Sequence, residues 1–117
     1  MEKLFLQYPK CTTCRKAKKF LIENNVSFND RYITIDNPTV EELERWIELS
    51  GLEVKKFFNT SGVLYREMNL KDKIKEMSKD EMIKLLATDG KLLKRPLLIC
   101  EDKVLVGFKE EQYKEIL

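Results

Sequence analysis

The sequence predicts an α/β fold in which a β-α-β unit is followed by a helical insertion, at about residues 38–90, and then by a β-β-α unit. Near the N-terminus, a short apolar stretch precedes an amphipathic helical pattern and a second stretch rich in aromatic and β-branched residues. In the last quarter of the chain, two short apolar runs flank a turn and precede a final helical pattern. We expect residues 1–117 to form a single domain, because this length is typical of one compact core.

The first unit begins with residues 3–8, which are short and apolar enough for a buried strand that Pro9 ends. From Thr12 onwards, apolar and basic residues interleave with a helical period until about residues 24–25. Residues 28–35 have the aromatic and β-branched composition of a second strand. The helical crossover between the two strands favours parallel pairing.

Two helices of the predicted insertion begin with the spacing of a capping box, in which Ser or Thr precedes Glu by three residues. The first helix extends to Gly51, and the second is followed by Gly90, where a C-terminal cap is expected. Between them we expect a short helical segment at 54–58, a turn at 59–62 and further helical residues at 70–77. The capping pairs are Thr39 with Glu42 and Ser78 with Glu81.

The final unit is a predicted hairpin followed by a helix. Residues 95–100 and 104–108 have the pattern of two short strands around a turn at 101–103. The last nine residues have apolar side chains spaced for one helical face. The complete order, β-α-β, helical insertion and β-β-α, is that of the thioredoxin fold.

Composition and charge indicate a soluble globular protein that binds no nucleic acid directly. Hydrophobic residues make up 43% of the chain and charged residues 36%. The 22 Lys and Arg exceed the 20 Asp and Glu by only two, which is too little for a phosphate-binding surface. The N-terminus lacks the pattern of a signal peptide, and no stretch approaches the roughly 18 apolar residues of a membrane span. We therefore expect a cytoplasmic protein with no membrane association.

A dithiol motif carries the predicted chemistry. Cys11 and Cys14 are three positions apart, which on the first turn of a helix is close enough for a disulfide. Cys11 is the candidate nucleophile, because the helix dipole and the nearby Lys10, Arg15 and Lys18 favour its thiolate. Cys14, one turn inside the helix, is the candidate resolving thiol. The sequence contains no histidine, so activation of the thiol must come from backbone dipoles or basic side chains.

Two alternatives to this chemistry remain open. The cysteine pair could be half of a structural zinc site, but Cys100 is the only other cysteine and histidine is absent, so we expect no metal. The two thiols could also be small buried hydrophobic side chains without reactivity. Cys100 itself lies at the end of an apolar strand and is expected to be buried.

The dipeptide Arg95-Pro96 is the second chemical signal. A proline that opens a strand facing the dithiol helix can adopt the cis form and line the site. Arg95 then offers a planar set of donors to an oxyanion or stabilises the thiolate of Cys11. The alternative is a solvated arginine in the basic run 91–95.

Four features along almost the whole chain resemble the arsenate reductase family of thioredoxin-like proteins, which includes the Spx-type regulators. The N-terminal motif and the Arg-Pro strand carry most of the resemblance, since a CxxC motif by itself is weak support. The four features are the motif YPKCTTCRK at 8–16, Gly51 eight residues before Asn59, Tyr65 ahead of the helix at 70–77, and the segment LLKRPLLI at 92–99.

The resemblance to glutaredoxin-coupled arsenate reductases implies a nucleophile at Cys11 and an oxyanion-binding arginine at Arg95. A second arginine of that pattern falls at Asn59, and a third falls near residues 107–109, where this sequence has no arginine. Members with an arsenate site also generally lack a cysteine at the Cys14 position. The resemblance implies that five further residues bind substrate: Thr12, Thr13, Arg15, Asn59 and Pro96.

The resemblance to Spx-type regulators implies a different function. In those proteins the CxxC motif is a redox switch, and a glycine at the Gly51 position is used to bind RNA polymerase. This sequence has both features, although Asn59 replaces an arginine of their pattern and the sequence ends at Leu117, before their extra C-terminal segment.

Our leading hypothesis is therefore a thiol-disulfide oxidoreductase with Cys11 as nucleophile, Cys14 as resolving thiol and Arg95 assisting anionic groups. It needs no cofactor and takes electrons from thioredoxin, glutaredoxin or glutathione. The alternative is a redox-switched regulator that binds the alpha subunit of RNA polymerase through Gly51. Arsenate reduction ranks below both.

Overall fold

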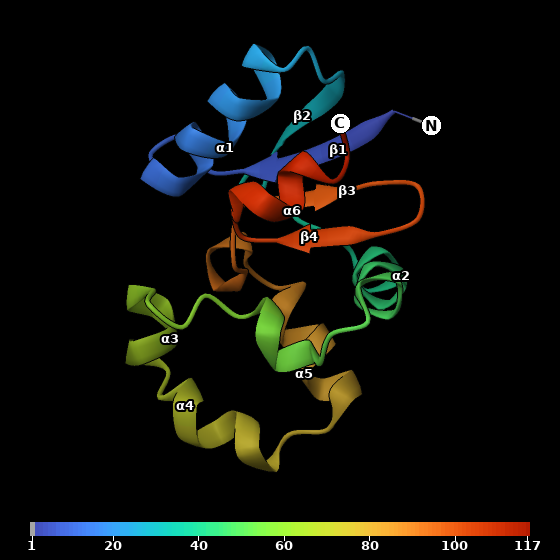
Figure 1. The fold of residues 1–117 in the computed structure, drawn as a ribbon. Coiled ribbons are helices and arrows are strands. Elements are labelled where there is room, and N and C mark those ends of the chain that lie inside the picture. Colours follow the sequence, from blue (N-terminus) through green and yellow to red (C-terminus); the bar gives the residue numbers. More distant parts are fainter. Residues whose placement is uncertain (1) are drawn as a thin grey trace.

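A four-stranded mixed sheet forms one half of the molecule in the computed structural model, which describes residues 2–117 (Figure 1). The strands are β1 (Lys3–Gln7), β2 (Phe28–Tyr32), β3 (Leu97–Ile99) and β4 (Val104–Val106). Their order in the sheet is β2-β1-β3-β4. Strand β1 is parallel to β2 and antiparallel to β3, and β3 is antiparallel to β4. This arrangement confirms the predicted α/β order.

Two helices cover one face of the sheet. They are α1 (Thr12–Glu23) and α6 (Glu110–Lys114). Ala17 and Leu21 of α1 are one helical turn apart and belong to the same buried cluster as Phe5 of β1 and Tyr113 of α6. Because successive strand residues point to opposite faces, Leu6 belongs to a second cluster on the other face.

The elements between β2 and β3 form the other half of the molecule (Figure 1). They are α2 (Val40–Ser50), η1 (Val54–Phe57), α3 (Val63–Glu67), α4 (Leu70–Lys73), η2 (Ile74–Glu76), α5 (Lys79–Leu86) and η3 (Gly90–Leu92). Both predicted capping boxes are present, at the starts of α2 and α5. Within residues 2–117, no helix has the length and apolar character needed to cross a membrane.

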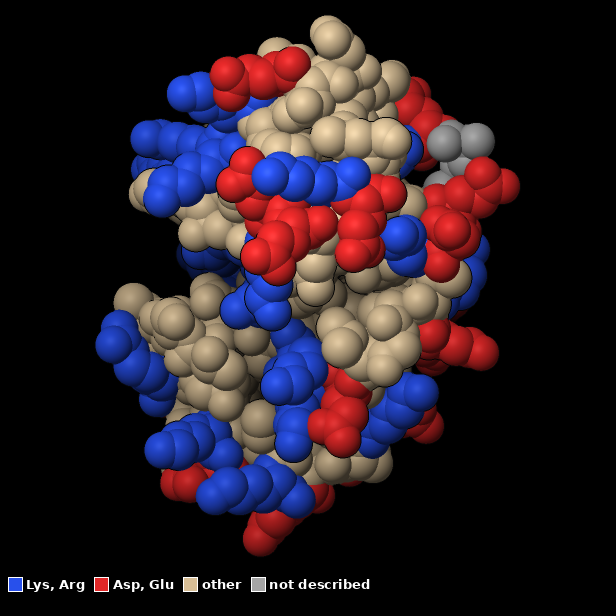
Figure 2. Space-filling view, in the orientation of Figure 1, with Lys and Arg blue, Asp and Glu red and all other residues tan. Residues whose placement is uncertain are grey.

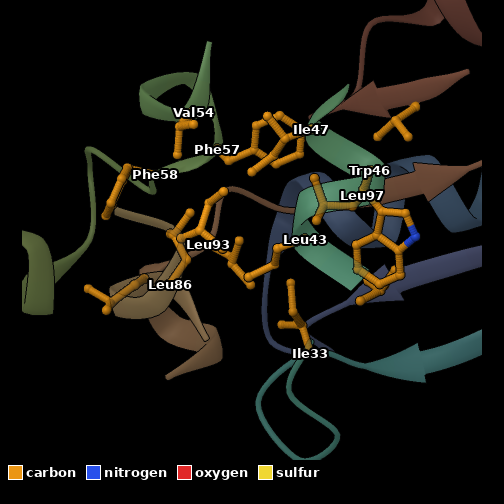
Figure 3. Close-up of a cluster of buried hydrophobic side chains, with 14 of the residues drawn as sticks. Ile33, Leu43, Trp46, Ile47, Val54, Phe57, Phe58, Leu86, Leu93 and Leu97 are labelled. Atoms are coloured by element: carbon orange, nitrogen blue, oxygen red, sulfur yellow. The ribbon is translucent and has the colours of Figure 1, made fainter. Parts of the chain in front are cut away.

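A buried apolar cluster joins the insertion to the sheet (Figure 3). Leu43 and Trp46 of α2 belong to it together with Leu97 of β3. Phe57 of η1 and Leu86 of α5 extend the cluster away from the sheet. Burial of each such side chain stabilises the fold by about 1.5–3 kcal/mol, so the insertion and the sheet share one apolar core.

Arg31 of β2 ties the start of the insertion to the sheet. Its guanidinium donates to both carboxylate oxygens of Glu42, at 2.7 and 3.0 Å, and to the carbonyls of Asp36 and Asn37, at 2.9 and 3.1 Å. It also lies over the ring of Trp46, 5.8 Å from the centroid. The hydrogen bonds and charge of Arg31 lower the pKa of Glu42, although burial opposes this.

The second strand is shorter than the sequence predicts, because the chain turns after Tyr32. The Ile33 N–H still donates to the Gln7 carbonyl of β1 at 2.9 Å. The N–H groups of Ile35 and Asp36 then both donate to the Tyr32 carbonyl, at 3.1 and 2.9 Å. Ile35 is 80% exposed, so its β-branched side chain lies in a turn and the predicted end of the strand at residue 35 is wrong.

Gly90 does not cap α5, as its position in the sequence predicted. That helix ends at Leu86 with Ala87 as its C-cap, and Gly90 begins η3 after the N-cap Asp89. A Cβ at position 90 would overlap the carbonyl oxygen of Ile33 and lie 2.7 Å from its carbonyl carbon. Glycine is required here because two main-chain segments approach each other closely.

Candidate active site

The dithiol lies where β1 passes into α1. Cys11 is the N-cap of α1, with extended backbone angles φ −84° and ψ 120°, and its N–H donates to the Tyr8 carbonyl at 3.0 Å. The Cys11 Sγ accepts the N–H of Cys14 at 3.4 Å. A sulfur therefore occupies the position where a Ser or Asp side chain commonly caps a helix, and it faces free N–H groups of the first turn. All three cysteines are free thiols.

The surroundings of Cys11 favour its thiolate. Desolvation of the half-buried sulfur by itself raises the pKa of Cys11. The hydrogen bonds with Cys14, together with the hydrogen bond and positive charge of Arg95, outweigh that effect and lower the pKa below its ordinary value. Lys18, one of the basic residues expected to act here, forms an ion pair with Asp30 at 2.8 Å.

Cys14 has the opposite environment. Its side chain is buried, and its Sγ accepts the N–H of Tyr8 at 3.5 Å. Desolvation, together with the neighbouring Cys11, raises the pKa of Cys14 to about 12. The two thiols therefore differ strongly: Cys11 is the accessible, acidic thiol and Cys14 the buried, protonated one.

Arg95 approaches this site from just ahead of β3, the strand that pairs antiparallel with β1. Leu6 is paired with Leu97, and continuing this antiparallel register places Tyr8 opposite Arg95. The guanidinium carbon of Arg95 lies 4.7 Å from the centroid of the Tyr8 ring. Its Nη1 is buried and has no hydrogen-bond partner within the described residues 2–117. Arg95 is thus a half-buried residue of the site and not a solvated member of a basic run, and the bond from Arg95 to Pro96 is cis.

Asn59 is held next to the segment that leads from η3 to Arg95 by main-chain hydrogen bonds. Its N–H donates to the Leu92 carbonyl at 2.7 Å, and the Lys94 N–H donates to the Phe57 carbonyl at 2.7 Å. The Asn59 carbonyl accepts the N–H of Gly62 at 3.1 Å, and a Cβ at position 62 would lie 2.7 Å from the Asn59 Nδ2. The Asn59 side chain therefore packs on its own turn.

The other residues predicted to bind substrate are found around the start of α1 or beside Pro96. Thr12 and Thr13 are exposed in the first turn of α1. Arg15 is also exposed, and its Nε donates to the Pro9 carbonyl at 2.8 Å. The third arginine of the family pattern would fall at 107–109, where this sequence has none. The N–H of Gly107, the first of these residues, donates to the Pro96 carbonyl at 2.8 Å.

The surface near α1 is basic and hollowed. Lys and Arg side chains gather over α1, whose sequence contains four of them (Figure 2). Figure 2 also shows a notch between this part of the surface and the part formed by α3, and the start of α1 lies at its edge (Figure 1). The start of α1, where Cys11 is half-buried, therefore lies beside a basic and concave part of the surface.

Gly51 lies apart from the dithiol. It is the C-cap of α2 in the left-handed conformation, with φ 71°, and a Cβ at this position would meet no atom within 4 Å. It borders a cavity of about 750 Å³ whose walls come from α2, η1, α4, η2 and α5, and Cys11, Cys14 and Arg95 do not line that cavity. The structure thus separates the predicted partner-binding residue from the predicted catalytic residues.

Tyr8 is a residue of the site to which the sequence assigned no chemical role, although it begins the motif at 8–16 and ends the predicted first strand. It contacts both cysteines through its main chain and Arg95 through its ring. An aromatic residue directly before Pro-x-Cys is the signal that could have drawn attention to it.

The chain is similar to several proteins over almost its whole length. It is 55% identical to the uncharacterized protein YusI of Bacillus subtilis, with 98% of each chain covered. It is 35% identical to the regulatory protein MgsR of Bacillus subtilis, covering 89% of this chain and 81% of MgsR. It is 29% identical to the global transcriptional regulator Spx 2 of Bacillus anthracis, covering 92% of this chain and 80% of the regulator.

Solved structures show the same fold. A Bacteroides fragilis protein described as related to the ArsC family superposes with a TM-score of 0.98 at 61% identity, covering 100% of this chain and 98% of that one. Arsenate reductase from Vibrio cholerae superposes with a TM-score of 0.88 at 30% identity, covering 100% and 98%. The family model that matches residues 6–116 is that of the ArsC family. The predicted resemblance is therefore confirmed, and the chain belongs to the ArsC family.

Proposed function

We propose that this protein is a thiol-disulfide oxidoreductase in which Cys11 is the nucleophile and Cys14 the resolving thiol. The observation that carries the proposal is the contrast between the two thiols at the start of α1. Cys11 is accessible, accepts an N–H and has a lowered pKa, whereas Cys14 is buried and has a raised pKa. Such a division between an attacking and a resolving thiol is what dithiol exchange requires.

In the first step the Cys11 thiolate attacks one sulfur of a substrate disulfide. A bond forms between Cys11 and that sulfur, the substrate disulfide bond breaks, and the leaving thiolate takes a proton from water. Arg95 assists by stabilising negative charge beside Cys11, since its Nη1 is buried without a hydrogen-bond partner within the described chain.

In the second step Cys14 loses its proton and attacks the Cys11 sulfur. The mixed disulfide breaks, the second substrate thiol leaves, and the Cys11–Cys14 disulfide forms. Once Cys11 is bonded to substrate, it can no longer carry the negative charge that contributes to the raised pKa of Cys14, so deprotonation of Cys14 becomes easier. The substrate has gained two electrons, and thioredoxin, glutaredoxin or glutathione in the cytoplasm returns the protein to the dithiol.

Coupled turnover of a model disulfide tests this proposal. NADPH oxidation is followed with thioredoxin or glutaredoxin and the respective reductase system, with hydroxyethyl disulfide as substrate. We expect turnover that Cys11→Ser abolishes, and Cys14→Ser should accumulate a mixed disulfide visible by mass spectrometry. Cys100→Ser is the matched control, because Cys100 is buried like Cys14 but lies directly after β3, outside the dithiol motif. Undiminished turnover in the Cys11→Ser, Cys14→Ser double variant would refute the proposal.

A second candidate function is redox-controlled binding to the alpha subunit of RNA polymerase. It is supported by the similarity to Spx 2 and MgsR and by the exposed position of Gly51, where an added side chain meets no part of the protein. A bulky residue there would alter the surface without disturbing the core.

Binding is tested with purified RNA polymerase and the reduced and oxidised forms of the protein. If this candidate is correct, one redox form binds more tightly and Gly51→Arg abolishes the difference. Gly51→Asn is the control, because asparagine tolerates the left-handed conformation of this cap with a smaller side chain. Equal binding in both redox forms, or no effect of Gly51→Arg, would rule it out.

Arsenate reduction remains the third candidate, and it is supported by the similarity to arsenate reductase from Vibrio cholerae. Asn59, which stands where the family pattern has an arginine, packs on its own turn, and residues 107–109 supply no guanidinium. Offering arsenate in the coupled assay described above tests it directly. Turnover that depends on Cys11 and Arg95 would support this candidate, and silence would exclude it.

A further inference from the structure

Tyr8 contacts each of the three residues that the proposed reaction uses. Its carbonyl accepts the N–H of Cys11 at 3.0 Å, and its N–H donates to the Sγ of Cys14 at 3.5 Å. Its ring lies 4.7 Å from the guanidinium carbon of Arg95. The main chain of Tyr8 makes the contacts with the two cysteines, and its side chain makes the contact with Arg95.

The sheet accounts for this arrangement. Leu6 and Leu97 are paired in the antiparallel ladder of β1 and β3, so two residues further along β1 the register brings Tyr8 opposite Arg95. Three residues after Tyr8 the chain reaches Cys11. The same guanidinium lies over the Tyr8 ring and, through its hydrogen bond and charge, acts on the Cys11 sulfur.

We infer that Tyr8 is a positioning residue of the dithiol site, whose ring holds the guanidinium of Arg95 beside the Cys11 sulfur. This role goes deeper into the proposed function and rests on it. An arginine side chain has many rotamers, and a free one would spend most of its time in water. Stacking on an aromatic face restricts the guanidinium to a plane and leaves its N–H groups free to point at an anion.

The unpartnered Nη1 of Arg95 agrees with this role. Buried guanidinium nitrogens normally have acceptors, and the one here has none within the described residues. The thiolate of Cys11, or the anionic group of a bound substrate, is the acceptor that this nitrogen lacks. Cys14 and Arg95 are the titratable or charged groups that affect the ionisation of Cys11.

The alternative is that Tyr8 only fills space, since it also packs against the large apolar cluster. Two substitutions separate these roles. Tyr8→Phe keeps the aromatic face and removes only the hydroxyl, whereas Tyr8→Leu keeps an apolar side chain and removes the face. A packing role predicts a loss of stability without a change at Cys11, and a positioning role predicts a change in the ionisation of Cys11.

The readout is the pKa of Cys11, measured from the pH dependence of alkylation by iodoacetamide with tandem mass spectrometry to assign the modified cysteine. Loss of a cation from beside a thiolate raises its pKa, and we expect Tyr8→Leu to raise that of Cys11 by about one unit. Tyr8→Phe should leave it unchanged. In an Arg95→Met background, where no guanidinium remains to be held, Tyr8→Leu should add no further shift.

An unchanged pKa in Tyr8→Leu would overturn the inference, and so would an equal shift with and without Arg95. Circular dichroism checks that each variant is folded. If Tyr8→Leu does not fold, Tyr8→Met replaces it, because methionine is similar in volume to leucine and more flexible. In the unaltered protein, the side-chain protons of Arg95 should show ring-current shifts in NMR spectra, and ordinary shifts would also refute the stack. None of these measurements needs a substrate, so a failure of disulfide turnover is distinguishable from a failure of this inference.

Discussion

Replacing Arg31 by methionine should destabilise the protein more than replacing any other charged residue whose ion pair is described above. Methionine keeps an apolar stem over Trp46 but removes both hydrogen bonds to Glu42 and those to the carbonyls of Asp36 and Asn37. Arg31 is mostly buried, with 14% of its side chain exposed, and Glu42 is 23% exposed. Glu42 would keep its charge in a half-buried position without the partner.

The expected cost follows from these contacts. A hydrogen bond between charged groups contributes about 1.5–3 kcal/mol, and a hydrogen bond to a neutral carbonyl contributes about 1 kcal/mol. Relaxation of Glu42 towards water offsets part of the sum, so we expect a loss of about 3 kcal/mol in the free energy of unfolding. In a domain of this length, that loss lowers the Tm by roughly 10 °C.

Urea unfolding followed by circular dichroism measures this difference, and Lys55→Met is the matched control. Lys55 pairs with Glu53 at 3.2 Å, but both side chains are largely exposed, so its loss should cost less than about 1 kcal/mol. The folded-state pKa of Glu42 is lowered, so its stabilising contribution is present above the unfolded-state pKa of about 4.3 and is lost as the pH falls through the folded-state pKa. The difference between the unaltered protein and Arg31→Met should therefore shrink below about pH 4. Equal costs for Arg31→Met and Lys55→Met would show that the Arg31 contacts stabilise no more than an exposed pair.

Three further outcomes are expected. Gly90→Ala should lower the free energy of unfolding by about 3 kcal/mol in urea titrations, because its Cβ overlaps the carbonyl of Ile33, and a cost below about 1 kcal/mol would contradict that close approach. Ser78→Ala should cost about 1 kcal/mol by the same measurement through loss of the cap of α5, and no cost would mean that the cap is not formed in solution. The rate of Cys11 alkylation should reach its plateau at a lower pH than that of an ordinary thiol, and Arg95→Met should move the plateau to higher pH; a plateau unmoved by Arg95→Met would remove Arg95 from the site.

Local patterns predicted the parts of the fold that depend on neighbouring residues. Both capping boxes are present where a Ser or Thr precedes a Glu by three residues, and α1 begins at Thr12 directly after the predicted nucleophile. These features depend on hydrogen bonds within one turn of chain, so they can be predicted from residues that are close together in the sequence. The order of helices and strands along the chain followed from the same periodicities, and the helical crossover between the first two strands indicated their parallel pairing.

Contacts between distant segments could not be predicted in this way. Residues 28–35 have a strand-like composition throughout, but main-chain hydrogen bonds to Tyr32 end the strand early and leave Ile35 in water. Gly90 looks like a helix cap because the sequence cannot show that the Ile33 main chain lies against it. The stack of Tyr8 on Arg95 depends on the register of β1 against β3, which pattern analysis does not give.

The position of Arg95 in the chain has a consequence for synthesis of the protein. Cys11 emerges from the ribosome early, but the strand that brings the guanidinium to it is among the last elements to be made. Before β3 pairs with β1, the thiol has no cationic neighbour from that strand and ionises less readily. The part of the lowered Cys11 pKa that comes from Arg95 is therefore acquired only when the sheet is complete, so the thiol of an unfinished chain ionises less readily than that of the folded protein.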